Sequence, residues 1–148
     1  MTHPIHPIDQ SQVVEALLSV NHLPTSDLRD GNVRLFGCEA DNKLCGVVGL
    51  EMHAHVALLR SLVVPATERG KGLGAALIAH AELFAAQQGV DTIYLLTTTA
   101  AVFFERYGYG HVARESAPAA IAGTHQFSEL CPSSSAFMAK SLAALRPA

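Results

Sequence analysis

A glycine-rich loop with two basic residues carries the clearest chemical signal in the sequence. It lies between an apolar strand-like run and a stretch with helical spacing, and it consists of Arg69, Gly70, Lys71, Gly72, Leu73 and Gly74. The first turn of a helix leaves backbone N–H groups without partners, and the helix dipole adds partial positive charge there. Glycines let this backbone approach a phosphate, and Arg69 and Lys71 add complementary charge. The loop therefore predicts a site for a pyrophosphate or a ribose phosphate.

The spacing within the loop excludes the two common nucleotide-binding patterns. A nucleoside-triphosphate loop places Ser or Thr directly after Gly-Lys to bind magnesium, whereas Lys71 is followed by Gly72. A dinucleotide fingerprint spaces its glycines as G-x-G-x-x-G, and here the pattern is G-x-G-x-G. A glycine-rich strand–helix turn that binds no ligand remains as the alternative.

An acidic and a basic residue stand inside two apolar strand-like runs. Glu51 ends the run at 44–52, and Arg60 interrupts the run at 56–64. Since only a short turn separates the runs, the two side chains are expected to face one another across a hairpin. A buried arginine normally needs a partner. The sequence leaves two interpretations open, a structural ion pair or an arginine that binds a ligand carboxylate in bidentate fashion.

The cysteines and histidines give weaker signals. Cys38, Cys45 and Cys131 form no C-x-x-C pair, and we expect them to be reduced and structural. His53 and His55 lie near a turn without a Cys or acidic cluster at ligand spacing. No metal site is predicted.

The composition limits the class of protein. With 148 residues, 49% of them hydrophobic and 16% charged, the chain is expected to form one globular domain over residues 1–148. A net charge of −3 provides no basic face for nucleic acid. The sequence shows no signal peptide and no apolar run of membrane-spanning length, so we expect no membrane partner and a cytoplasmic location.

Periodicity predicts the elements that position these residues. Helices are expected from Asp9, from Gly72 to just before Gly89, and over 100–107 with Thr99 as N-cap. Strands are expected at 33–40, 44–52, 56–64, 92–97, 109–114 and 136–142. Hairpins followed by one strand–helix–strand crossover indicate an α/β fold, with a mostly antiparallel sheet and helices on its faces.

Two segments resemble a known superfamily. Arg69, Gly72 and Gly74 match the Q/R-x-x-G-x-G/A signature of the GCN5-related N-acetyltransferase (GNAT) superfamily, at its strand–helix junction. Residues 101–109 resemble the A-x-x-F-Y-x-x-x-G-F helix-to-strand passage of the same superfamily. The resemblance covers essentially the whole chain and implies the GNAT fold, a mixed, mostly antiparallel central sheet with helices on both faces.

A narrower resemblance concerns the acceptor. The segments that carry it are 58–64, 94–99, 126–127, 131–132 and 138–140, which look like the acetyltransferases associated with arsenic-resistance operons. This resemblance implies acetylation of amino-acid-like compounds such as arsinothricin, a relative of phosphinothricin.

The superfamily resemblance also implies how acetyl-CoA binds. Its pantetheine arm would pair with the exposed backbone of Leu62, Val63 and Val64, where this strand splays from the strand at 92–97. Main-chain N–H groups of residues 69–74 would hold the pyrophosphate. Phe103 and Arg106 would flank the arm or the adenosine.

The reaction implied is direct attack of a neutral small-molecule amine on the thioester. Glu51 is the candidate base, and Arg60 the candidate anchor for a substrate carboxylate. Phe104 occupies the position where many relatives carry a Tyr that protonates the departing thiolate, and it has no proton to donate. Neither Tyr107 nor Tyr109 occupies that position. A non-catalytic acyl-CoA-binding module of the same fold is therefore the alternative, and a homodimer paired through the final strand is a further expectation.

Overall fold

The computed structural model describes residues 5–8, 18, 32–40, 43–65, 72–124, 127 and 135–143. Several sequence predictions lie outside these residues. They are the helix expected from Asp9, except for its buried Leu18, and the site residues Arg69, Gly70 and Lys71. Cys131 also lies outside the described part of the chain.

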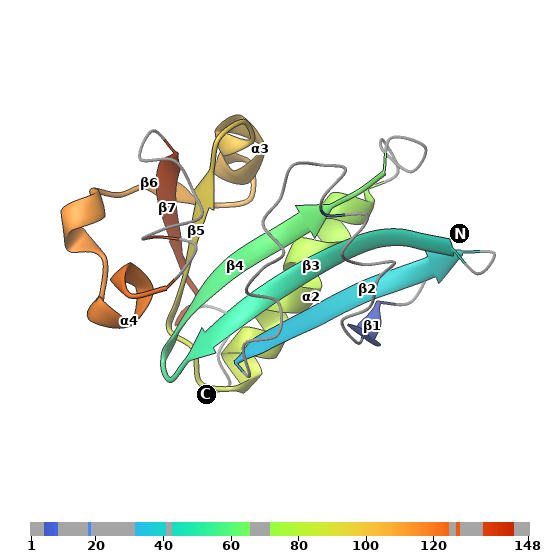
Figure 1. The fold of residues 1–148 in the computed structure, drawn as a ribbon, viewed down its shortest axis with the longest axis horizontal. Helices are drawn as coiled ribbons and strands as arrows, with labels where there is room; N and C mark the ends of the chain where they lie inside the picture. The colour runs from blue at the N-terminus through green and yellow to red at the C-terminus, as the bar shows by residue number, and fades with distance from the viewer. Residues whose placement is uncertain are drawn as a thin grey trace.

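The described strands form one mixed sheet. Its order is β1-β2-β3-β4-β5-β7-β6, and only the neighbours β4 and β5 run parallel (Figure 1). The bounds are β1 His6–Ile8, β2 Val33–Ala40, β3 Lys43–His53, β4 Val56–Val63, β5 Thr92–Thr97, β6 Gly110–His111 and β7 Ala136–Ser141. The single parallel pair is the consequence of the one helical crossover. The predicted mixed, mostly antiparallel sheet is confirmed.

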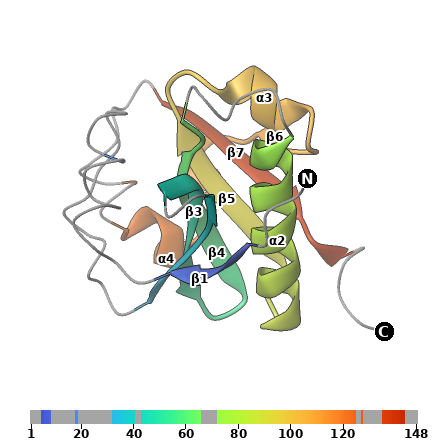
Figure 2. The ribbon, with the colours of Figure 1, turned by 90° about the vertical axis from the view of Figure 1, so that its right-hand side faces the viewer.

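Helices lie on both faces of the sheet. Helix α2 (Leu73–Gln87) makes the crossover from β4 to β5 and packs along one face, and α4 (Ala119–Ala122) lies on the other (Figure 2). Helix α3 (Ala101–Glu105) follows β5, and a 3-10 turn, η2 (Arg114–Ser116), precedes α4. This arrangement confirms the predicted α/β class.

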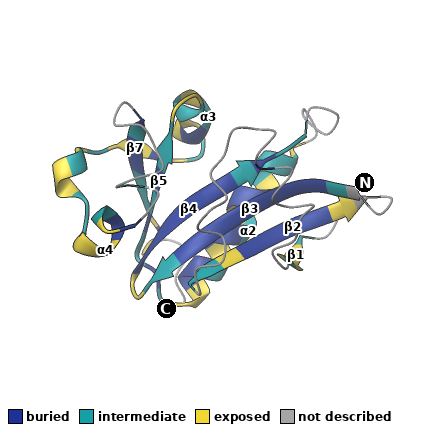
Figure 3. Cartoon of the chain, in the orientation of Figure 1, coloured by how far each residue is buried: buried dark blue, intermediate teal, exposed yellow. Residues whose placement is uncertain are grey.

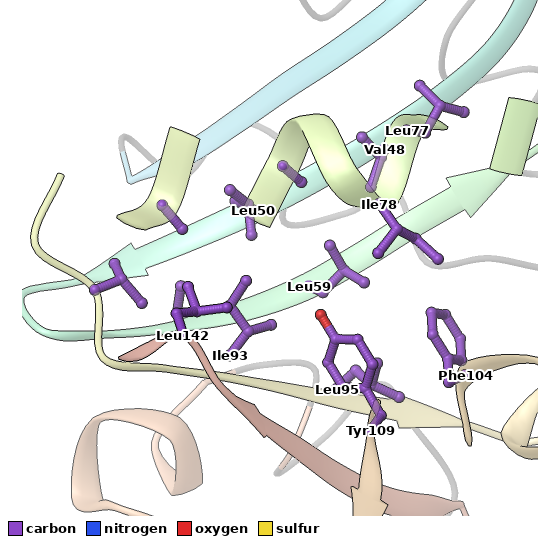
Figure 4. Close-up of a cluster of buried hydrophobic side chains, with 14 of the residues drawn as sticks. Val48, Leu50, Leu59, Leu77, Ile78, Ile93, Leu95, Phe104, Tyr109 and Leu142 are labelled. Carbon is purple, nitrogen blue, oxygen red and sulfur yellow. The ribbon is translucent and has the colours of Figure 1, made fainter. Parts of the chain in front are cut away.

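The alternation of side chains along β4 divides the core between the two faces. Ala57 and Leu59 join the cluster under α2, whereas Val56 and Leu58 join a cluster with Ile121 of α4. The central strands are accordingly buried for most of their length (Figure 3). The α2-side cluster is drawn in Figure 4 and includes Val48, Leu50, Leu59, Leu77, Ile78, Ile93, Leu95, Phe104, Tyr109 and Leu142.

Most predicted elements are confirmed within one or two residues, and three predictions need correction. The strand expected at 109–114 shrinks to Gly110–His111, because the chain leaves β7 and turns into η2 at Arg114. The helix expected at 100–107 is helical only over Ala101–Glu105. Thr99, the predicted N-cap, does not accept a hydrogen bond from the first N–H group. The hydroxyl of Thr97 accepts from the Ala100 N–H, at 3.0 Å.

The final strand, β7, has neighbouring strands on both sides near its middle. Strand β7 pairs with β5 on one side, and on the other side β6 covers Met138 and Ala139. A homodimer that exchanges this strand or pairs its free edge stays a prediction.

Candidate cofactor and acceptor site

Strands β4 and β5 share a ladder over only part of their length. Their pairing runs from Val56 and Thr92 to Leu59 and Leu95. Beyond this point β4 stays on β3 as far as Val63, and β5 stays on β7, so the two strands diverge (Figure 1). Beyond Leu59 the described part of β5 therefore makes no ladder with β4, at the segment where the resemblance to GNAT proteins implies that the pantetheine arm binds.

A β-bulge marks the start of this divergence. Val47 lies opposite Val63 and Gly49 opposite Arg60, so two residues of β4 face the single residue between Val47 and Gly49. Ser61 carries a φ of 59°, a left-handed conformation that costs a non-glycine residue about 1–3 kcal/mol. A bulge bends its strand and re-aims its side chains, and here the Arg60 Nε donates to the Ser61 Oγ at 3.1 Å.

Among the described residues, no side chain caps the backbone N–H groups at the start of helix α2. Its N-cap Gly72 has a φ of 77°, and the first turn of the helix contains no acidic residue and no side-chain cap. The Ala76 N–H donates to the Gly72 carbonyl at 3.1 Å and closes the first helical turn. The N–H groups before it point along the dipole toward the end of the helix, which is the arrangement that binds anions.

Gly74 allows helix α3 to pack against the first turn of α2. A β-carbon at Gly74 would lie 3.2 Å from Cζ of Phe103 and 3.9 Å from Cγ2 of Val64. The end of β4, the start of α2 and the aromatic side chain of α3 therefore meet at one place. Arg106 is exposed at the C-cap of α3. Of the predicted cofactor residues that are described, the structure brings Val64, Gly74 and Phe103 together.

Glu51 and Arg60 lie on the sheet face opposite α2, and both are buried. The Nη1 atom of Arg60 is 3.7 Å from Oε1 of Glu51. The predicted facing of these two side chains across the hairpin is confirmed, although they are diagonal neighbours, since Glu51 pairs with Leu58 and Arg60 with Gly49. The structure therefore contains the ion pair between Glu51 and Arg60, which is one of the two interpretations that the sequence left open.

His53 also contacts Glu51, and this contact was not predicted from the sequence. Its Nε2 is 2.6 Å from Oε2 of Glu51, and because an ionised carboxylate only accepts, Nε2 donates. The Asn32 amide Nδ2 lies 3.3 Å from the same Nε2 and donates to the Met52 carbonyl. The signal was present in the sequence, since Glu51 and His53 are two residues apart on a strand and therefore share a face.

Tyr109 and Phe104 are both buried in the α2-side core. The Tyr109 hydroxyl donates to Oε2 of Glu82 at 2.9 Å, and Nζ of Lys140 donates to Oε1 of Glu82 at 2.9 Å. Burial, followed by the charge and hydrogen bond of Glu82, raises the pKa of Tyr109 far above its usual value. The hydroxyl points toward α2, beside Phe104 (Figure 4). Tyr109 therefore holds the core together and is not placed to protonate a thiolate.

The family is decided by comparison with known proteins. A family model described as "Acetyltransferase (GNAT) domain" matches residues 31–111, more than half of the chain. The chain belongs to this GNAT acetyltransferase family. The matched region contains β2 to β6, and thus the β4–β5 divergence, the start of α2, and the pair formed by Glu51 and Arg60.

Known relatives of this GNAT domain extend the comparison. An uncharacterized N-acetyltransferase of Chlorobaculum tepidum is 36% identical over 63 residues, which are 43% of this chain and 40% of that protein. The chain thus matches less than half of the relative's length.

Solved structures share the GNAT fold at low identity. N-acetylglutamate synthase from Neisseria gonorrhoeae, complexed with coenzyme A and N-acetyl-glutamate, has a TM-score of 0.78 and 17% identity, covering 96% of this chain and 35% of that chain. An aminoglycoside 6'-N-acetyltransferase complexed with coenzyme A has a TM-score of 0.71 and 19% identity, covering 98% of this chain and 99% of that chain. These likenesses confirm the fold.

Two further properties of this GNAT domain concern metals and membranes. Among the described residues, no group of three or more His, Cys, Asp or Glu side chains is arranged to hold a metal ion. None of the helices in the described ranges is long and apolar enough to cross a membrane.

Proposed function

We propose that this protein is an acetyl-CoA-dependent N-acetyltransferase that acts on the amine of a small, amino-acid-like molecule. The observation that carries the proposal is the convergence of the part of β4 that diverges from β5, the start of α2 and Phe103 of α3 around Gly74. Two similar structures, the synthase from N. gonorrhoeae and the aminoglycoside enzyme, contain coenzyme A and support this assignment.

Each part of the cofactor meets a matching part of the chain. The amide groups of the pantetheine arm pair with the backbone of Leu62, Val63 and Val64, as an added strand would. The pyrophosphate binds the N–H groups of residues 69–74, where Arg69 and Lys71 supply positive charge. Phe103 and Arg106 flank the arm or the adenosine.

Glu51 removes the proton as the amine attacks the thioester carbonyl. The nitrogen forms a bond to the carbonyl carbon, the carbon–sulfur bond breaks, and CoA leaves as the thiolate. His53, whose side chain is 21% exposed, links the buried Glu51 carboxylate to solvent. It donates Nε2–H to Oε2 of Glu51 and so orients the carboxylate. After transfer Glu51 loses the proton to solvent, and the ionised base is restored. Nη1 of Arg60 lies 3.7 Å from the other carboxylate oxygen of Glu51, Oε1.

An aromatic wall on the same face favours a small acceptor. Tyr94 stacks on Phe137 with ring centroids 5.4 Å apart, and Phe127 packs edge-on against Phe137 at 5.2 Å. These rings belong to the cluster that contains Leu58, the partner of Glu51 in the ladder. A charged cluster beside an apolar wall suits a molecule with both an amine and a carboxylate, which is the chemistry of an amino acid.

The proposed acceptors include arsinothricin-like compounds. The sequence resemblance to acetyltransferases of arsenic-resistance operons supports this class, and the N-acetyl-glutamate bound to the synthase from N. gonorrhoeae supports an amino-acid acceptor in general. Arg60 would then bind the acceptor carboxylate in bidentate fashion, in addition to its contact with Glu51.

A thiol-release screen tests the proposed function. Acetyl-CoA is incubated with the protein and with amino acids, phosphinothricin-like compounds, polyamines or peptides, and free CoA is measured. The proposal predicts release that depends on an amino-acid-like acceptor. Release only with peptides would indicate a protein acetyltransferase instead.

The second candidate function is a non-catalytic acyl-CoA-binding module. The observation that favours it is Phe104, which has no hydroxyl at the family's acid position and is buried in the core. Tight acetyl-CoA binding without thiol release from any acceptor would establish this alternative.

A further inference from the structure

Two cysteine thiols lie against each other inside the β2–β3 hairpin. The Sγ atoms of Cys38 on β2 and Cys45 on β3 are 2.7 Å apart. Both residues are buried, and neither is in a disulfide. They are seven residues apart in the sequence and form none of the usual cysteine motifs, so their contact is a product of the fold.

A β-bulge brings the two sulfurs together. Cys38 lies opposite Gly46 and Glu39 lies opposite Leu44, so Cys45 has no residue of its own across the ladder. In a regular strand, Cys45 and Gly46 would point to opposite faces. The bulge turns Cys45 onto the face of Cys38, which is the α2 face, since Phe36 two residues earlier belongs to the α2-side cluster.

The separation of the sulfurs favours a disulfide over a metal ion. Two cysteine ligands of tetrahedral zinc, each about 2.3 Å from the metal, place their sulfurs about 3.8 Å apart. A disulfide bond is about 2.05 Å long. The observed 2.7 Å is closer to the disulfide, and only a small movement of one side chain is needed to form the bond.

We propose that Cys38 and Cys45 are a site of reversible oxidation, at which a peroxide closes an intramolecular disulfide. One thiolate attacks the peroxide and becomes a sulfenic acid, with release of water. The second thiol then attacks this sulfur, forms the S–S bond and displaces a second water. Two thiols lose two protons and two electrons, and one hydrogen peroxide is reduced to two waters.

The location of the two cysteines determines how fast their thiols can be oxidised and which residues surround them. Only thiolates react, so the buried thiols react through opening of the hairpin end, more slowly than an exposed cysteine. Across the ladder from Cys38, a β-carbon at Gly46 would lie 2.9 Å from Leu77 and 3.1 Å from Leu73. The pair therefore lies beside the first two turns of α2.

Peptide mapping tests the proposal, because trypsin cuts between the two cysteines. Cleavage after Arg34, Lys43 and Arg60 yields peptide 35–43 with Cys38 and peptide 44–60 with Cys45. The chain is treated with hydrogen peroxide in native buffer, alkylated, digested and analysed by mass spectrometry. We expect one linked species that lacks two hydrogens relative to the sum of the peptides, and that dithiothreitol separates.

Two cysteine variants serve as controls for the peptide mapping. Cys131→Ser should give the same linked species, which shows that the third cysteine takes no part. Cys38→Ser should abolish it while leaving the Cys45 peptide open to alkylation. Recovery of both peptides fully alkylated, or as sulfinic acids without a link, would overturn the proposal. Protection of both thiols by stoichiometric zinc, without any link after peroxide, would assign the pair to a metal and would also overturn it.

Discussion

The Glu51 carboxylate is 2.6 Å from Nε2 of His53, and this contact joins a buried carboxylate to a partly exposed imidazole. On its other side, the same carboxylate lies 3.7 Å from Arg60. A base must be held in hydrogen-bond reach of the proton that it removes. We therefore propose that His53 orients Glu51, the proposed base.

Replacement of Glu51 by Gln keeps the shape of the side chain and removes the base. We expect kcat to fall about 10²–10⁴-fold, the usual contribution of general base catalysis. The acetyl-CoA KM should change little, because Glu51 is on the sheet face opposite α2, where the acceptor is proposed to bind. Steady-state kinetics across pH checks this, and a variant whose kcat and pH–rate profile equal those of the wild type would remove Glu51 as the base.

His53→Asn tests the contact that orients Glu51, and His55→Asn is its matched control. Both histidines flank the same hairpin turn, but His55 is exposed in the turn itself, whereas His53 contacts Glu51. We expect His53→Asn to lower kcat and alter the pH–rate profile, and His55→Asn to alter neither. Equal behaviour of the two variants would leave His53 with a purely structural role.

Arg60→Lys separates the two interpretations of the buried arginine. If Arg60 binds the acceptor carboxylate, the KM for an amino-acid acceptor should rise about tenfold or more, since lysine lacks the bidentate fork. The KM for the corresponding amino-acid amide, which has no carboxylate, should change much less. An equal loss with both acceptors, together with a lower Tm, would indicate that Arg60 serves only its ion pair with Glu51.

Gly74→Val probes the meeting point of β4, α2 and α3. A side chain at this position would push Phe103 away from the first turn of α2, since even a β-carbon would be 3.2 Å from the ring. We expect the Kd for acetyl-CoA to rise about tenfold or more in calorimetric titration, from loss of the cofactor's surroundings. Gly110→Val is the control, because a β-carbon there meets nothing within 4 Å. Unchanged cofactor affinity in Gly74→Val would place the cofactor elsewhere.

Tyr109 makes the stability of the fold sensitive to alkaline pH. Its pKa is raised in the folded state by burial first and then by Glu82, so the folded chain keeps the proton that the unfolded chain loses above about pH 10. The unfolded state then binds fewer protons, and the free energy of unfolding falls as pH rises. In urea titrations, Tyr109→Phe should be less stable by about 1–3 kcal/mol at neutral pH, because it lacks the bond to Glu82, and should lose less stability above pH 10. An unchanged alkaline slope would contradict this account.

Elements with a strong period could be predicted from the sequence alone. Leu77 and Ala81 repeat at helical spacing, and both are buried on the sheet side of α2. The helix stops before Gly89, which has the left-handed φ of 87° expected of a C-terminal glycine. In β5, the β-branched and aromatic residues between Thr92 and Thr97 predicted the strand with its observed bounds. In these segments local preference and tertiary packing agree.

Other features depend on tertiary contacts that no local pattern reports. The residue with a positive φ at the β4 bulge is Ser61 and not a glycine, so the sequence does not indicate the bulge. The bulge arises from the register between β3 and β4. Helix α4 has only four residues, too few for a helical period to show. Tyr109 resembles a strand residue in sequence, but its hydroxyl bonds to Glu82 on a helix far away in the chain.

Only part of the candidate site could be predicted, because some of its contacts also depend on the tertiary structure. Motif spacing predicted the start of α2 and the facing of Glu51 and Arg60, because both follow from single elements or one hairpin. The contact of Phe103 with Gly74 joins two helices separated by β5, and no sequence pattern reports the distance between them. His53 shares a strand face with Glu51, yet their contact becomes visible only once the distance between them is known.

Transfer of a labelled acetyl group is the decisive test of the proposed reaction. Acetyl-CoA labelled with carbon-13 in its acetyl group is mixed with the protein and with the best acceptor from the thiol-release screen, and all products are followed by mass spectrometry. We expect one labelled N-acetylated acceptor for each CoA released, with no label on the protein, and loss of both products in Glu51→Gln. Label found only as acetate or on the protein, or bound acetyl-CoA that never reacts, would contradict the proposed reaction.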